Sequence, residues 1–204
     1  MEESLIIENH PLAPFLPENA QLLMLGSFPP QERRWSMNFY YPNFINDMWR
    51  IFGIIFFKDK NHFVNQRDKS FFREEIIQFL TERGIALFDT ATAVRRLNDN
   101  ASDKFLEIVQ PTDIKSLLDK IPECKAVAVT GQKATETFLP QFDIKVPKIG
   151  NFTPFSYQNR QLRFYRMPSS SRAYPLKLEH KAALYQKMFE EILSQPPLSI
   201  INNY

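Results

Sequence analysis

The sequence predicts an α/β fold, a three-layer α/β/α sandwich with a central, mostly parallel four-stranded sheet. Short continuous apolar runs, of the kind that form buried strands, alternate with longer stretches whose apolar residues recur at helical spacing. Strand-helix-strand alternation is typical of parallel sheets, because parallel neighbours need a crossover connection. Such folds bind ligands at the carboxyl ends of their strands, and we expect the functional site there.

Four segments are the expected strands. Gln21–Leu25 is an apolar run that stops at the turn residues Gly26-Ser-Phe-Pro-Pro30. The other three are Ile85–Phe88, Lys125–Thr130 and the alternating segment Gln161–Arg166.

Helices are expected between and after these strands. Their apolar residues fall at i, i+3 and i+4 spacing, and Gly84 is a typical helix stop. The expected helices run from about Asp47 to Ile55, from about Lys69 to Arg83, from about Asp113 to Lys120, onward from Gly131, and across Leu178, Ala182, Tyr185, Phe189 and Ile192.

Length and composition fit one globular domain over residues 1–204, with 1–19 as an N-terminal extension and 196–204 as a loosely held tail. No apolar run approaches the ~18 to 20 residues of a membrane helix. Glu2, Glu3 and Glu8 stand where a signal peptide is basic, so we expect a cytoplasmic protein that does not bind membranes.

Metal and redox chemistry have little support in the sequence. Cys124 is the only cysteine, and His10, His62 and His180 do not form a metal-ligand pattern. We therefore expect neither a metal nor a cofactor, and we interpret each histidine as a surface or core residue.

Positive charge is concentrated late in the chain, although the net charge is only +2. Residues 157–181 hold six Lys or Arg residues against Glu179 alone. Such a segment can neutralise phosphates by releasing counterions, or it can be a solvated face.

Four motifs follow one another along the chain. The first is Leu25-Gly-Ser-Phe-Pro29, followed by Tyr40-Tyr41-Pro-Asn-Phe-Ile-Asn46-Asp-Met-Trp49. The others are Leu87-Phe-Asp89, Val129-Thr-Gly131-Gln-Lys-Ala134 and Met167-Pro168-Ser169-Ser170-Ser171. In this order the motifs resemble those of the uracil-DNA glycosylase superfamily, and most of all its branch of mismatch-specific and hypoxanthine-DNA glycosylases. The chain departs from the branch at Pro30, at Asn43-Phe44 and at Arg172.

The resemblance implies a monomeric, monofunctional enzyme of base excision repair. Its partner would be DNA that contains a deaminated base, uracil or hypoxanthine, which it would flip out and release by hydrolysing the glycosidic bond. The resemblance places Tyr41, Ser27, Phe28 and Tyr40 against the base, whereas core or rim packing is the plainer role for the tyrosines.

Asn46 matches the catalytic asparagine of the hypoxanthine-type branch. A neutral amide is not a useful proton acceptor near pH 7, but it can position water or polarise the base. The alternative is a helix cap, because asparagine is a preferred cap and a helix is expected to begin just after it.

The remaining candidates concern DNA contacts and support. Ser169, Ser170, Ser171 and Arg172 would contact the DNA backbone, unless they form an ordinary serine-rich turn. Lys133, near a helix start, could receive a phosphate or be a surface lysine. Asp89 could hold a loop amide, bind the sugar or act as an acid-base group, with loop support as the preferred role.

Two rival functions remain at this point. One is a noncatalytic nucleic-acid or damage-binding module of the same fold. The other is an unrelated α/β hydrolase acting on nucleosides, which only the fold class suggests, because GxSxG, GxGxxG and GxxxxGK motifs are missing.

Overall fold

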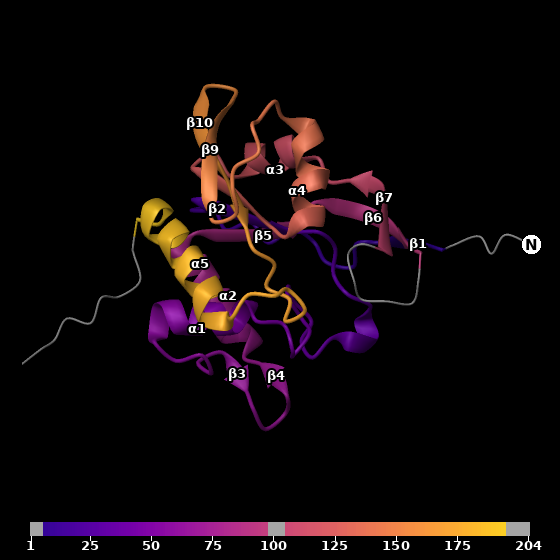
Figure 1. The fold of residues 1–204 in the computed structure, drawn as a ribbon, viewed down its shortest axis with the longest axis vertical. Coiled ribbons are helices and arrows are strands. Elements are labelled where there is room, and N and C mark those ends of the chain that lie inside the picture. Colours follow the sequence, from indigo (N-terminus) through magenta and orange to yellow (C-terminus); the bar gives the residue numbers. More distant parts are fainter. Residues whose placement is uncertain (1–5, 98–104, 195–204) are drawn as a thin grey trace, which may run out of the picture.

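The computed structural model describes residues 6–97 and 105–194 as a mixed α/β structure (Figure 1). The tail 196–204, which we expected to be loosely held, lies outside the described residues, as do residues 1–5 of the N-terminal extension. Within the described ranges, no helix is long and apolar enough to cross a bilayer.

The central sheet has five strands in the order β5-β2-β8-β10-β9. Four of them are parallel and correspond to the expected strands: β2 (Leu22–Gly26), β5 (Ile85–Asp89), β8 (Ala126–Thr130) and β10 (Arg160–Met167). Every residue of β2, β5 and β8 is buried, as their uninterrupted apolar runs predict.

The prediction of four strands was wrong, because β9 (Asn151–Tyr157) is a fifth strand that pairs antiparallel with β10. This segment is not among the strands expected from the sequence, and it contains Pro154. A proline cannot donate to a sheet ladder, but it is tolerated on an edge strand, which is the place of β9.

Helices lie on both sides of the central sheet (Figure 1). One group, at the bottom and left of the view, contains α1 (Met48–Phe57), α2 (Arg73–Arg83) and α5 (Leu178–Ile192). On the other side lie α3 (Ile114–Lys120) and α4 (Gln132–Phe138). The layers therefore follow the expected sandwich.

Two features were not expected from the sequence. Helix α2 begins four residues later than the expected Lys69, because β4 (Ser70–Phe71) pairs with β3 (Val64–Asn65). A second sheet also forms beside β5, in the order β1-β6-β7. Its strands are β1 (Ile7–Asn9), β6 (Ala91–Arg96) and β7 (Leu106–Pro111). Among the described residues, short 3-10 helices are found at η1 (Glu32–Arg34) and η3 (Leu139–Gln141).

The N-terminal segment is held by backbone hydrogen bonds to the second sheet and to β5. Strand β1 pairs antiparallel with β6, and Phe15 exchanges backbone hydrogen bonds with Leu87 of β5 at 2.9 and 3.0 Å. The described part of the expected extension is thus hydrogen-bonded to the strands that carry the site.

Candidate functional site

A cleft of about 750 Å³ opens where the parallel strands end. Gly26 closes β2, Asp89 closes β5 and Thr130 closes β8, and all three line the cleft. Because these strands are parallel and in neighbouring positions, the loops that follow them meet at one edge of the sheet. The cleft therefore lies where the fold class places a ligand site.

Tyr41 and Asn46 line this cleft together. The Tyr41 backbone has a φ of 51°, a left-handed conformation that is uncommon for a bulky side chain and that recurs at functional sites. Its ring packs edge-on against Trp49, with 5.9 Å between the centroids, and its hydroxyl lies 3.4 Å from Thr130 Oγ1. Burial, and secondarily the charge of Asp89, raises the pKa of Tyr41, so the hydroxyl is neutral.

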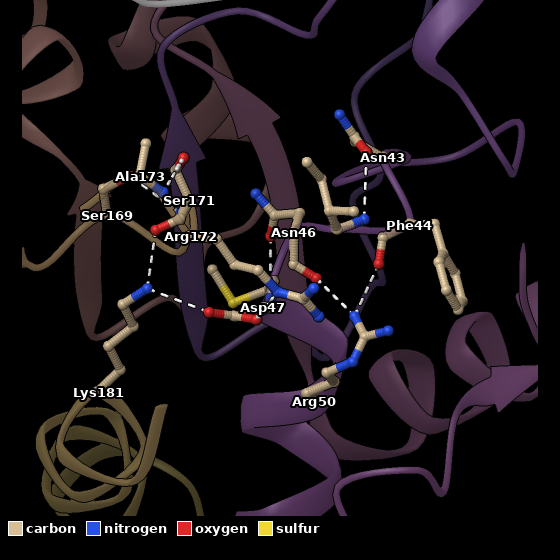
Figure 2. A network of polar contacts seen from close by, with 12 residues as sticks. Asn43, Phe44, Asn46, Asp47, Arg50, Ser169, Ser171, Arg172, Ala173 and Lys181 are labelled. Carbon is tan, nitrogen blue, oxygen red and sulfur yellow. Dashed lines mark hydrogen bonds and ion pairs between the residues drawn. The ribbon is translucent and has the colours of Figure 1, made fainter. Parts of the chain in front are cut away.

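Asn46 lies just before the N-cap residue of α1, which is Asp47, and one end of its carboxamide closes a turn there. Its Oδ1 accepts the backbone N–H of Met48 at 2.9 Å, at the start of α1. Only an oxygen can accept this N–H, so the bond fixes which end of the carboxamide is which. The nitrogen is turned away from α1 (Figure 2), which leaves an N–H donor on a residue that lines the cleft.

A network of charged residues holds the segment around Asn46 (Figure 2), and all of them but Arg172 are buried. The Asp47 carboxylate lies 3.2 Å from Lys181 Nζ and 3.1 Å from Arg172 Nε. Arg50 donates to the carbonyls of Phe44 and Asn46, at 2.8 and 3.0 Å. Burial, and secondarily the positive charge of Arg172, lowers the pKa of Arg50. Both sides of Asn46 are thereby fixed.

The serine loop is joined to the same network. The Ser170 carbonyl accepts the backbone N–H of Asp47 at 3.0 Å, and the Ser171 carbonyl accepts from Lys181 Nζ at 2.8 Å. Ser170 is buried and Ser171 is exposed. Ser169 Oγ accepts the backbone N–H of Ser171, a local hydrogen bond that is typical of a serine-rich turn. The loop is a turn, and it also lines the cleft.

The first loop forms another wall of the cleft through Ser27 and Phe28. Arg96 steadies it, because its guanidinium donates to the Pro29 carbonyl at 2.7 Å and pairs with Glu8 at 2.9 Å. Four cationic residues line the cleft, and these are Arg34, Arg96, Lys133 and Arg172. The cleft thus combines an aromatic ring, a carboxamide and positive charge.

Asp89 and His10 form a buried pair at the cleft. His10 Nε2 lies 2.7 Å from Asp89 Oδ2, and the two side chains are 3% and 10% exposed. The Thr112 hydroxyl donates to the Asp89 backbone carbonyl at 2.7 Å. Asp89 itself lines the cleft.

Most of the residues that the sequence singled out meet in this cleft, and Tyr40 does not. The cleft is lined by Ser27, Phe28, Tyr41, Asn46, Asp89, Lys133, Ser169, Ser170, Ser171 and Arg172. Tyr40 is buried behind them, and its hydroxyl donates to the Ala13 carbonyl at 2.8 Å. Its ring packs in the core, so the structure does not bring Tyr40 into the lining of the cleft.

Sequence reasoning missed several residues that shape the site. His10 was interpreted as an isolated histidine, and Asp47, Lys181 and Arg96 were not considered as parts of a site. Each pairs with a residue at least 79 positions away in the sequence. No local pattern could have revealed these pairs.

No family model matches the sequence. The chain is 27% identical, over 121 residues, to the hypoxanthine DNA glycosylase of Methanosarcina acetivorans. That alignment spans 59% of this chain and 70% of the relative. The fold is similar to that of a candidate uracil DNA glycosylase from the same organism, solved by NMR in solution. The TM-score is 0.60 at 21% identity, over 91% of this chain and 98% of the other.

Proposed function

We infer that the chain belongs to the uracil-DNA glycosylase superfamily, on its hypoxanthine branch, as its motifs predicted and as both similarities support. We propose that it is a DNA glycosylase that everts a deaminated base, uracil or hypoxanthine, and hydrolyses its glycosidic bond. The observation that carries this proposal is the shared cleft of Tyr41 and Asn46 at the carboxyl end of the sheet.

The cleft suits an everted base. A base inside a duplex does not expose its glycosidic bond, so the enzyme has to extrude the nucleotide and hold the base by stacking and by hydrogen bonds to its edge. The volume of about 750 Å³ is within the usual range of ligand sites. Tyr41 supplies a neutral aromatic ring for stacking, while Ser27 and Phe28 line another part of the wall.

The hydrogen bond from Met48 to Asn46 orients the Asn46 amide. Cleavage makes the sugar oxocarbenium-like and the departing base negative. Since Oδ1 is turned toward the Met48 N–H, Nδ2 is the donor at the other end of the amide. An N–H held in place can stabilise negative charge on the leaving base without reorganising during the reaction. We therefore favour polarisation of the base over positioning of water as the role of Asn46.

The cationic side chains of the cleft would hold the DNA backbone. Lys133 and Arg172 lie at the cleft, and half of the Arg172 side chain is exposed although it pairs with Asp47. Contacts of this kind position DNA by neutralising phosphates, and they carry no base preference. Ser171 is exposed beside them and can approach the backbone closely.

The direct test uses the purified chain and oligonucleotides with one uracil or one hypoxanthine, as single strands and as duplexes. We expect abasic sites with at least one of these bases, and loss of that activity in Asn46→Ala. The matched control is Asn65→Ala, which removes an asparagine whose amide bonds Asp68 outside the cleft.

The same assay separates the rival functions. Tight binding to a lesion without abasic sites would point to a noncatalytic damage-binding module. Release of bases from free nucleosides but not from DNA would point to a nucleoside hydrolase. Either result would contradict the proposal.

A further inference from the structure

The Asp47 carboxylate does not serve the helix that it precedes. Asp47 is the N-cap residue of α1, where an aspartate side chain usually accepts a backbone N–H of the first helical turn. Among the described residues it finds no such donor. Its two oxygens lie instead 3.1 Å from Arg172 Nε and 3.2 Å from Lys181 Nζ (Figure 2). Arg172 follows the serine loop and Lys181 belongs to α5, so the carboxylate connects α1 with a distant part of the chain.

The peptide group between Asn46 and Asp47 is held from two sides. Its carbonyl accepts from Arg50 Nη1 at 3.0 Å, and its N–H donates to the Ser170 carbonyl at 3.0 Å. Since a peptide group is planar and rigid, these two bonds restrict the backbone that carries the Asn46 side chain. One bond comes from α1 and the other comes from the serine loop. The position of Asn46 therefore depends on the position of that loop.

Lys181 fixes the serine loop against the same carboxylate. Its Nζ donates to the Ser171 carbonyl at 2.8 Å as well as to Asp47, and its side chain is buried. Removing one partner of a buried ion pair is costly, because it leaves an uncompensated charge. The serine loop, Asp47 and α5 are thus held together as one unit.

Arg172 is the member of this cluster that reaches solvent. Half of its side chain is exposed, whereas the Asp47 side chain is only 8% exposed. A guanidinium carries five N–H donors in a planar fork, and in the part of the chain that the structure describes only Nε has a hydrogen-bond partner. Arg172 also lines the cleft, so its two terminal nitrogens are available to a phosphate there. One guanidinium can therefore bridge Asp47 and DNA.

We propose that Asp47 is a positioning residue that makes the placement of Asn46 depend on a phosphate bound by Arg172. The inference rests on the proposed function and deepens it by naming how DNA regulates the same site. A phosphate on the terminal nitrogens stabilises the guanidinium where it also holds Asp47, and Asp47 shares a peptide group with Asn46. Excision is then fast only when the DNA backbone is bound beside the cleft, and a free nucleoside, which lacks a phosphate, is a poor substrate.

Asp47→Asn is the direct test, because asparagine keeps the size of the side chain and its capacity to cap α1 but removes the charge. Single-stranded DNA with one uracil or one hypoxanthine is the substrate. The single-turnover rate at saturating enzyme and the dissociation constant are measured separately. We expect the saturating rate to fall by roughly 10- to 100-fold, the effect of a small misplacement of a catalytic group. DNA affinity should be no weaker, since Arg172 keeps its charge and a nearby anion is removed.

Arg172→Met, alone and combined with Asp47→Asn, tests whether the two side chains act together. Alone it should lower DNA affinity, and it should also lower the saturating rate by roughly 10-fold. In the Asp47→Asn background it should still lower the affinity but change the saturating rate by less than about 2-fold, because the link to Asn46 is already broken. Independent, additive losses of rate would contradict the proposal.

The matched controls break an ion pair of the same kind outside the cleft. Arg95 and Glu107 lie 3.3 Å apart on the second sheet, both are partly exposed, and neither lines the cleft. Arg95→Met and Glu107→Gln should leave both the saturating rate and the DNA affinity close to those of the unmodified chain.

The outcomes separate this inference from the proposed function. If the unmodified chain excises neither base, both fall. If it excises a deaminated base and Asp47→Asn keeps the saturating rate, the role of Asp47 is refuted while the glycosylase assignment stands. A loss that disappears at higher enzyme concentration also refutes it, because Asp47 then contributes to binding alone.

A second variant covers a failure to fold. Asp47→Asn leaves the buried Lys181 without its anionic partner, so the combination of Asp47→Asn with Lys181→Met repeats the test without an unpaired buried charge. We expect the same loss of saturating rate with unweakened affinity from this pair. If neither variant folds, the half-exposed Arg172 decides, and an unchanged saturating rate in Arg172→Met refutes the proposal.

Discussion

The carboxylate of Asp47, at the start of α1, lies 3.2 Å from the ammonium nitrogen of Lys181, on α5, and the lysine side chain is only 1% exposed. The pair connects the start of α1, which follows Asn46, with α5, the helix that follows the serine loop. Lys181 also donates to the Ser171 carbonyl, so one buried ammonium links three parts of the site.

Replacing Lys181 by methionine should destabilise the fold by about 3 kcal/mol, because it leaves a buried carboxylate with one cationic partner fewer. Urea denaturation measures this loss. In the Asp47→Asn background the same substitution should cost distinctly less. Equal losses in both backgrounds would show that the two charges are not coupled in the folded chain.

Tyr41 should act through its ring rather than through its hydroxyl. We expect Tyr41→Phe to retain excision within a few-fold, since it loses only the 3.4 Å contact with Thr130. Tyr41→Ala should lower it by roughly 10- to 100-fold, the scale of one base-aromatic stack. Single-turnover rates provide the test, with Tyr157→Ala as a control on a tyrosine outside the cleft. A larger loss in Tyr41→Phe than in Tyr41→Ala would assign the role to the hydroxyl instead.

Lys133 and Arg172 should contribute to DNA affinity and to its salt dependence. Each alanine substitution is expected to weaken binding and to lower the slope of log affinity against log salt by about 1, without altering base preference. Titrations at several salt concentrations measure the slope. Lys60→Ala, on the exposed turn after α1, serves as the control. Unchanged slopes in both cleft variants would remove these residues from the DNA interface.

Cys124 makes the stability of the fold sensitive to alkaline pH. Burial raises the pKa of its thiol from 9.0 to about 11. Between these values the unfolded chain loses the proton while the folded chain keeps it, so stability falls as pH rises through this window. The contribution is up to about 2 to 3 kcal/mol. Denaturation curves from pH 8 to 11 should therefore decline less steeply in Cys124→Ala. Parallel declines would mean that the thiol is exposed to solvent.

The sequence predicted the elements whose signal is local. The parallel strands are apolar runs that end in turn residues, and α5 carries its apolar residues at helical spacing. Both signals lie within one segment, so the sequence predicted the strands and the helix. Strand β9 was missed because an edge strand buries little and can contain Pro154. Strand β1 was missed because its pairing with β6 bridges more than 80 residues of sequence.

The same distinction applies to the site. Tyr41 and Asn46 stand five residues apart in one motif, so their shared cleft could be expected from the sequence. His10 and Asp89 are 79 residues apart, and Asp47 and Lys181 are 134 residues apart. Those pairs are products of the tertiary fold, and only the folded chain reveals them.

Excision by Asn46→Asp tests the central claim most directly. Aspartate keeps an oxygen that can accept the Met48 N–H, but it replaces the N–H donor by a negative charge beside the departing base. We predict an unchanged melting temperature and a single-turnover rate on uracil or hypoxanthine DNA that is lower by ~10²-fold or more. An Asn46→Asp variant that melts and excises like the unmodified chain would contradict the account.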